Sequence, residues 1–253
     1  MIVHTLDEYS DFQSSYFIRR AQRGETVHKF GRNQDINIAT VPEVIWNGGG
    51  GYTGFDATSA ETLTVVSNNI ADNSTGTGAR TILLNGLDGN YNEIEELVTL
   101  TGLTPTVATT LSFIRMNGAM VKTVGSNGSN IGNLTVTNSI SGDVFAVLPS
   151  WANQTVICAY TIPAYKTGYL VKWGASIIGF TGSIRDGDIS LEIREFGGGF
   201  TIKTLTTIAE RRNYNAILPC PIVIPSKADV QMTCTRVSGN NTTIAGTFDI
   251  VHL

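Results

Sequence analysis

Apolar and polar residues alternate with a period of two along most of this chain. Runs of this kind are separated by clusters of Asn, Gly, Asp and Ser, as between short strands. Strands at such close spacing, with no helical pattern between them, predict an all-β fold: an antiparallel β-sandwich or jelly-roll body of one or two units. The predicted strands lie at 62–66, 80–84, 94–100, 113–124, 134–137, 156–162, 169–173, 189–194, 200–205, 221–225, 229–237 and 245–251.

The first residues follow a helical period instead. Thr5 and Glu8 fit a capping box, and Gly24 is a natural helix stop, so a short helix is predicted from about residue 6 to about residue 23. Four apolar residues recur at steps of three and four and form one stripe. Because so short a helix is marginal in water, the stripe needs a partner surface. The predicted docking residues are Leu6, Tyr9, Phe12 and Tyr16.

Four consecutive glycines, Gly48 to Gly51, divide the chain after an extended stretch. Such a run is entropically costly to order and reads as a linker, although one irregular surface loop inside a single domain is the alternative. The expected organisation is a helix and extended docking arm at 1–47 and a Gly-rich linker at 48–59. A β-sandwich half or domain follows at 60–148, and a jelly-roll half or domain at 149–253.

Composition narrows the functional classes. Only 15% of the residues are charged, against about 25% in ordinary soluble proteins, while 32 Thr, 19 Asn and 17 Ser supply the polarity. The net charge of −4 and the scattered basic residues argue against a nucleic-acid partner. No apolar run has the length of a membrane span, and no signal segment opens the chain. We therefore expect a soluble protein, folded in a reducing cytosol, with no membrane partner.

The residues that most often carry catalysis or bind metals are isolated. His4, His28 and His252 have no ligand or nucleophile at a useful spacing. The three cysteines cannot form a disulfide framework, and Cys158 and Cys234 fall in β-patterned runs where a thiol behaves as a small buried apolar group. A core role is expected for these two.

Two acidic segments imitate functional motifs. Residues 88–92 resemble the opening of an EF-hand loop, but Glu93 stands where Gly is needed and Thr99 where a bidentate Glu belongs. Glu93, Glu95 and Glu96 could supply a glycosidase carboxylate pair, although solvated edge carboxylates are commoner. We therefore predict no catalytic residue, no cofactor and no metal site, and a protein that is not an enzyme.

Two stretches of the chain resemble recurring sequences in structural proteins of tailed-bacteriophage virions. The first comprises residues 76–82, 86–93 and 98–102, and the second comprises residues 160–170, where Gly usually stands at the position of Tyr165. The resemblance implies a virion structural protein with β-sandwich or jelly-roll domains, often a homotrimer. The implied partner is the major capsid protein or another virion protein.

Within that class we favour a head decoration (cement) protein, made in the host cytoplasm and located on the phage head surface. The basis is the short chain, the N-terminal arm and the absence of fibre-type repeats. A head-fibre or tail protein that binds a receptor or glycan is the alternative, and a polysaccharide-degrading enzyme is a weaker one. Scattered aromatic residues could form a stacking platform for a glycan, although core positions are commoner for them: Trp46, Tyr52, Trp151, Tyr165 and Trp173.

Overall fold

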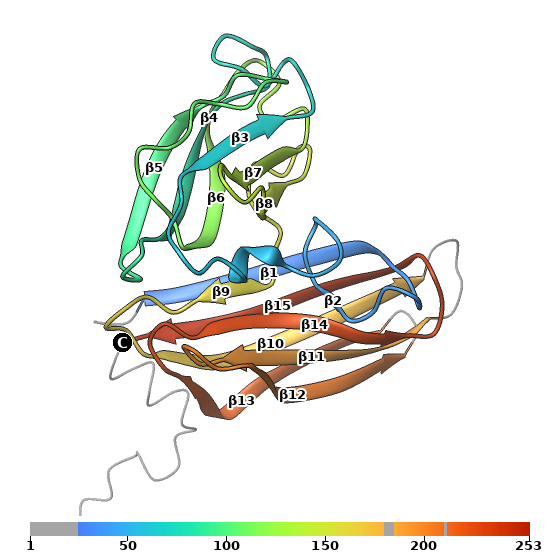
Figure 1. The fold of residues 1–253 in the computed structure, drawn as a ribbon. Helices are drawn as coiled ribbons and strands as arrows, with labels where there is room; N and C mark the ends of the chain where they lie inside the picture. The colour runs from blue at the N-terminus through green and yellow to red at the C-terminus, as the bar shows by residue number, and fades with distance from the viewer. Residues whose placement is uncertain (1–24, 180–184, 210–211) are drawn as a thin grey trace, which may run out of the picture.

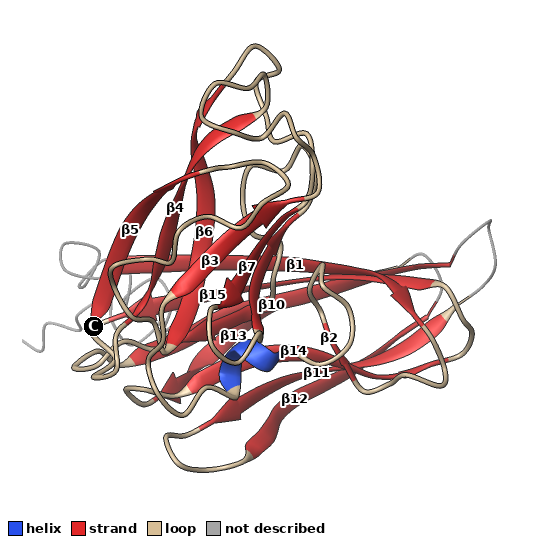
Figure 2. Cartoon of the chain, turned by 45° about the horizontal axis from the view of Figure 1, so that its top comes forward, coloured by secondary structure: helices blue, strands red, loops and turns tan. Residues whose placement is uncertain are grey.

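A computed structural model describes residues 25–179, 185–209 and 212–253. They form an all-β fold of four antiparallel sheets arranged in two units (Figure 1). Within these ranges the one helical segment is a 3-10 turn, η2 (Thr53–Phe55), shown in blue in Figure 2. The predicted all-β class is confirmed. The predicted N-terminal helix and its docking residues Leu6, Tyr9, Phe12 and Tyr16 lie outside the described residues.

The larger unit, here called the main sandwich, is built from both ends of the described chain. One sheet has the order β1 (Glu25–Ile36), β15 (Thr242–His252), β10 (Gly168–Gly179), β13 (Asn213–Ile224). The other has the order β12 (Phe200–Ala209), β11 (Asp186–Arg194), β14 (Asp229–Val237), β2 (Glu43–Val44), and β9 (Ala159–Thr161) also pairs with β14.

Alternating side chains from the two sheets fill the space between them. Trp173 and Phe248 come from the first sheet, and Leu191 and Met232 come from the second; all four are fully buried. This arrangement follows from the period of two, because alternate residues of a strand face the same side. A single apolar core therefore holds the two sheets of the main sandwich together.

β2 and β9 act together as one interrupted strand. Both run antiparallel to β14, β2 opposite Thr233 and Cys234 and β9 opposite Asp229 to Gln231. Between them the Met232 carbonyl accepts from the Ile45 amide at 2.9 Å, and the Met232 amide donates to the Cys158 carbonyl at 3.0 Å. The chain thus leaves the main sandwich after β2 and returns at β9 to complete the same edge.

The excursion forms the second unit, here called the inserted unit. Its two sheets have the orders β3 (Leu63–Ser67), β7 (Leu134–Asn138), β8 (Val144–Leu148) and β5 (Glu93–Thr99), β4 (Ala79–Leu87), β6 (Arg115–Val124). They enclose a separate core that includes Leu84, Phe113 and Phe145. In Figure 1 this unit stands above β1 and β9 of the main sandwich.

The chain segments that make up the two units differ from the expected ones. Residues 25–47, expected to belong to a docking arm, form β1 and β2 of the main sandwich, so that unit combines them with the predicted 149–253 half. The glycines of the expected linker turn back on β2: the Val44 amide donates to the Gly50 carbonyl at 3.0 Å, and the Gly50 amide donates to Glu43 at 2.9 Å. Gly49 and Gly50 have φ values of 71° and 64°, which favour glycine.

Candidate functional site

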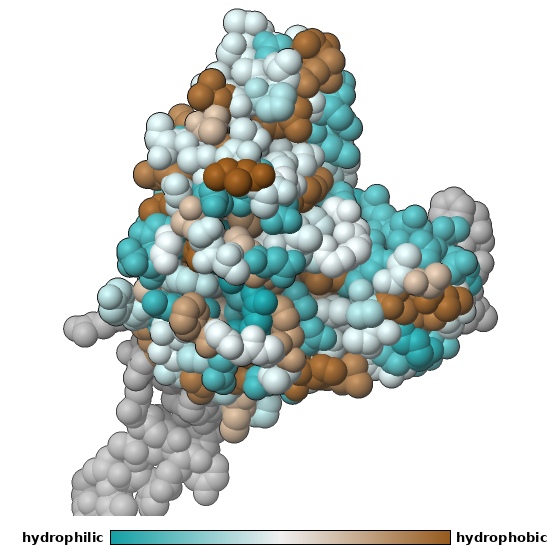
Figure 3. Space-filling view, viewed as in Figure 1, coloured by the Kyte–Doolittle hydropathy of each residue, from teal (hydrophilic) through white to brown (hydrophobic). Residues whose placement is uncertain are grey.

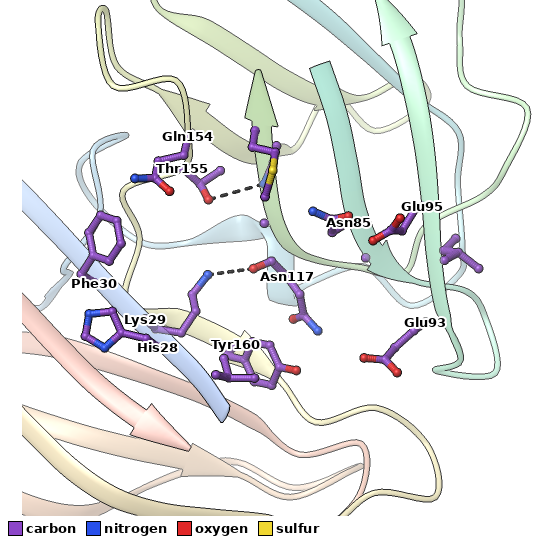
Figure 4. Close-up of a pocket in the computed structure, with 16 residues that line it drawn as sticks. His28, Lys29, Phe30, Asn85, Glu93, Glu95, Asn117, Gln154, Thr155 and Tyr160 are labelled. Atoms are coloured by element: carbon purple, nitrogen blue, oxygen red, sulfur yellow. Dashed lines mark hydrogen bonds between the residues drawn. The ribbon is translucent and has the colours of Figure 1, made fainter. Parts of the chain in front are cut away.

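A cleft of about 360 Å³ separates β1 from the inserted unit (Figure 4). His28, Lys29 and Phe30 of β1 form one side, while Glu93 and Glu95 of β5 lie opposite. Beside the cleft, two hydrogen bonds join β6 of the inserted unit to β9 of the main sandwich. The Asn117 side chain of β6 accepts from the Thr161 amide of β9 and donates to the Thr161 carbonyl, both at 2.9 Å. Hydrogen bonds therefore connect the two units at this cleft.

Lys29, which lines this cleft, is unusual because it is a buried lysine. Its side chain is buried, and its Nζ donates to the main-chain carbonyl of Asn117 at 2.7 Å (Figure 4). No carboxylate forms an ion pair with it in the described part of the chain. Burial lowers the pKa of Lys29 to about 8. An amine at this position ties β1 to β6 and keeps its charge at neutral pH.

The carboxylates considered as an acid–base pair make structural contacts. Glu93 pairs with Lys166, whose Nζ lies 2.6 Å away and also contacts Glu25 at 2.7 Å. Glu96 accepts the main-chain amides of Thr110 and Leu111, each at 2.8 Å. Glu95 lines the cleft. Two of the three carboxylates thus hold neighbouring segments in place.

The EF-hand-like segment is a turn between β4 and β5. Asp88 Oδ1 accepts the amides of Asn90 and Asn92 at 2.8 and 2.9 Å, and Oδ2 accepts from the Asn92 side chain at 3.1 Å. Partial burial raises the pKa of Asp88, but these hydrogen bonds lower it by more, so the pKa lies below its ordinary value. Its oxygens serve the turn itself. Across the described ranges, no group of three or more His, Cys, Asp or Glu side chains is placed to hold a metal ion.

The histidines that the structure describes, His28 and His252, have different surroundings. His28 pairs with Asp249 across the β1–β15 ladder, and His4 lies outside the described residues. His252 is buried against Tyr160, with ring centroids 5.4 Å apart, and neither of its ring nitrogens has a hydrogen-bond partner among the described residues. Burial, with the nearby Lys166 charge, lowers the His252 pKa. The imidazole therefore packs as a neutral ring.

The cysteines are free, and two of them are buried. Cys158 and Cys234 belong to the core of the main sandwich, as the sequence pattern predicts. Burial raises the pKa of Cys158 and raises that of Cys234 to about 12. Cys220 is exposed on β13. The buried thiols act as small apolar side chains at neutral pH.

The aromatic residues considered as a stacking platform do not come together. Trp46, Tyr52 and Trp173 are buried, the first two against each other and Phe55. Trp151 and Tyr165 are exposed, both with left-handed backbone angles. The sequence reasoning missed Phe196, an exposed ring at the tip of the β11–β12 hairpin. Its position directly before three glycines, Gly197 to Gly199, which predict a hairpin loop, was the sequence feature that could have indicated an exposed ring.

Tyr165 occupies the position where the resembling virion proteins usually have Gly. Its φ is 64°, a left-handed conformation that costs an L-residue about 1–2 kcal/mol, and its side chain is 95% exposed. Tyr165→Gly should therefore raise the free energy of unfolding by about 0.5–1 kcal/mol, after the extra chain entropy of glycine is subtracted. Urea unfolding measures this, with Tyr165→Ala as the control that removes the ring and keeps the strain. An equal gain in both variants would contradict the strain argument.

The edge of the main sandwich formed by β12 and β13 exposes several aliphatic side chains. Each strand ends its sheet, and the two contact each other on the side away from the inserted unit (Figure 1). We call their exposed aliphatic residues the edge surface: Ile202 and Leu205 on β12, and Ile217 and Val223 on β13, each more than half exposed. On the face in Figure 3, apolar residues elsewhere form separate patches among hydrophilic ones.

β13 is an edge strand protected by a bulge and by prolines rather than by charges. Its twelve residues include no charge, and four of them, Leu218 to Pro221, bulge out of the ladder with β10. Edge strands commonly carry Lys or other charges that prevent association. Pro219 and Pro221 lack an amide hydrogen, so a continuous added strand is excluded over the bulge. Side-chain packing is therefore the contact that this edge offers.

No protein-family model matches the chain, and no curated protein matches it. Among solved structures, it is similar to the cowpea mosaic virus top component (naturally occurring empty particles) at 6% identity, covering 76% of this chain and 80% of that one, with a TM-score of 0.23. It is also similar to the CBM22-1–CBM22-2 tandem domain of Paenibacillus barcinonensis Xyn10C (10% identity; 90% and 93% covered; TM-score 0.23). A third is the infectious bursal disease virus VP2 subviral particle (9%; 90% and 71%; 0.18). The similarity is weak and identifies no family. In the described ranges no helix has the length and apolarity to cross a lipid bilayer.

Proposed function

We propose that this protein is a non-enzymatic structural component of a bacteriophage virion, a decoration protein that binds the head shell as a homotrimer. The observation that carries the proposal is the edge surface, which exposes aliphatic side chains on two neighbouring edge strands whose one charged residue is Lys203. Association buries such a surface, and closed symmetry is its usual form in homo-oligomers. The proposed occupant of the edge surface is a second copy of this chain.

The strand order supports a jelly-roll assignment for the main sandwich. When β2 and β9 are counted as one strand, the first sheet contains strands 1-8-3-6 in order and the second contains strands 2-7-4-5. Two four-stranded sheets connected in this way form a jelly roll, an architecture used in viral capsids. The sequence resemblance of residues 76–102 and 160–170 to virion proteins points to the same class.

Analytical ultracentrifugation tests the trimer. We expect the wild type to sediment at about 81 kDa, three times the 27.1 kDa chain mass. Ile217→Asp combined with Val223→Asp should give a folded monomer, because each substitution buries an unpaired charge in the contact. Ile140→Asp and Val107→Asp, at exposed residues of the inserted unit, are the matched control and should leave the trimer intact. A wild-type monomer at tens of micromolar would overturn the proposal.

Attachment to the head is tested separately. β1 begins at Glu25, so a chain that starts there lacks the predicted helix and keeps every described strand. We expect this shortened chain to remain folded and trimeric but to lose co-sedimentation with purified phage heads. Leu6→Asp with Phe12→Asp should reproduce the loss. Full binding by the shortened chain would place the docking residues in the β units instead.

A further inference from the structure

A second cavity, of about 510 Å³, opens between the two units, where the β11–β12 hairpin lies beside the inserted unit. Five segments distant in sequence line it: the residues after η2, the β4–β5 turn, the start of β6, the β11–β12 hairpin, and the residues around the start of β14. Junctions between units are a common place for ligand pockets, and this volume lies in their usual range. We call it the hairpin cavity.

The cavity wall contains two arginines that share one carboxylate. Arg115 Nε donates to Asp229 Oδ1 at 3.1 Å, and Arg194 donates to Asp229 Oδ2 from Nε at 3.0 Å and from Nη2 at 2.7 Å. Asp229 is 3% exposed and also accepts from Thr161. Within this cluster two cations share one anion, whereas the residues that line the whole cavity include three cations and three carboxylates. An anionic group in the cavity would give the two arginines a second acceptor.

Lys227 is a third cation of the cavity wall and has no acidic partner in the described part of the chain. Its Nζ lies 5.5 Å from the ring centroid of Tyr91 and 5.3 Å from that of Phe196, and no carboxylate pairs with it among the described residues. Arg194 Nη1 likewise has no hydrogen-bond partner in the described ranges. The acidic residues that line the cavity besides Asp229 are Asp56 and Glu195, both exposed to solvent.

Phe196 supplies an apolar surface next to these cations. The ring is 66% exposed, and its edge-on contact with Tyr91 at 5.6 Å fixes its orientation. A flat ring with free cationic donors beside it matches a ligand that has both an apolar face and a carboxylate. Sugar acids have this combination, since the C–H face of the pyranose ring packs on an aromatic ring and the carboxylate accepts from Arg and Lys.

We propose that the hairpin cavity binds the acidic sugar units of a glycan, with the carboxylate near Arg194 and Lys227 and the sugar ring on Phe196. This binding activity goes beyond the structural role and does not depend on it. It would enable the protein to attach to carboxylated surface polysaccharides while the edge surface is occupied in a trimer.

Saturation-transfer difference NMR with the full chain tests the proposal, with glucuronic acid and N-acetylneuraminic acid as probes and glucose as the neutral control. We expect saturable binding of the acids, at least tenfold tighter than that of glucose. Lys227→Asn should weaken it at least tenfold, because asparagine tolerates the left-handed backbone of Lys227 (φ 64°) and removes the charge. Phe196→Ala should weaken it similarly, while Lys122→Ala, at an exposed lysine of β6, should leave it unchanged.

Three outcomes would overturn the assignment. The first is equal binding of glucose and glucuronic acid, and the second is wild-type affinity in both cavity variants. The third is full displacement of the acid by equimolar inorganic phosphate, which would show a site for small anions. Since trimer formation is measured by sedimentation, failure here leaves the proposed function intact, and the reverse also holds.

Discussion

Asp229→Asn should lower the free energy of unfolding by about 3–5 kcal/mol, the cost of breaking a buried ion pair by removal of one partner. Arg115 belongs to the inserted unit, whereas Arg194 and Asp229 belong to the main sandwich. The Arg115 and Asp229 side chains are 7% and 5% exposed. Without the carboxylate, two guanidinium groups would face each other across the junction with no counter-charge. The substitution therefore removes the electrostatic tie between the units.

Urea unfolding, followed by near-ultraviolet circular dichroism, measures this loss. The matched control is Asp188→Asn, which removes the partner of Arg236 in an ion pair of 2.6 Å whose arginine is half exposed. Exposed pairs contribute about 0–1 kcal/mol, so the control should change stability by no more than that. A loss below about 1 kcal/mol for Asp229→Asn would show that the junction does not depend on this cluster.

The contribution of Lys29 to the stability of the protein should rise with pH between about 8 and 10.5. The pKa of this lysine is about 8 in the fold and has its ordinary value of 10.5 in the unfolded chain. Between these values the unfolded state binds more protons, so raising the pH favours the folded state. At about 1.4 kcal/mol per pKa unit, the full difference corresponds to about 3 kcal/mol. Below pH 8 the lysine is charged in both states, and its contribution no longer changes.

Lys29→Met isolates this effect. Urea unfolding at pH 7.5, 9 and 10.5 should show the rise in the wild type relative to the variant, while Lys122→Met, at an exposed site of β6, should follow the wild type. The tyrosines and cysteines with raised pKa values act in the opposite direction above pH 9, but they are present in all three proteins. Parallel curves for wild type and Lys29→Met would contradict a buried, unpaired lysine.

The positions of most strands were predictable because they follow from local patterning. The strands of the inserted unit, β3 to β8, span residues 63–148. Cys158 and Cys234 were predictable as core residues because a thiol within an alternating run faces the same side as its apolar neighbours. The left-handed backbone of Tyr165 was not predicted, although the resembling sequences usually have Gly at that position.

β1 was not predictable as a strand of the main sandwich. Its buried positions include Lys29, Gly31 and Asn33, which carry no apolar signal. These residues are polar or small because of the groups that they contact in the folded chain. Lys29 reaches Asn117, Asn33 donates to Glu43 at 2.7 Å, and a Cβ on Gly31 would lie 2.3 Å from the Ile45 carbonyl oxygen. Each contact spans the junction or the interrupted strand, so only the folded chain explains it.

The sequence by itself determined the all-β class, most of the strand positions and the buried thiols, because these depend on the alternation of side chains along one segment. Tertiary structure decided which strands pair, that β2 and β9 share one edge, and that Arg115, Arg194, Lys227 and Phe196 meet in one cavity. Pairing of this kind depends on contacts between residues more than two hundred positions apart, as in the β1–β15 ladder, where Glu25 pairs with His252. Such contacts bring together residues that local periodicity leaves unrelated.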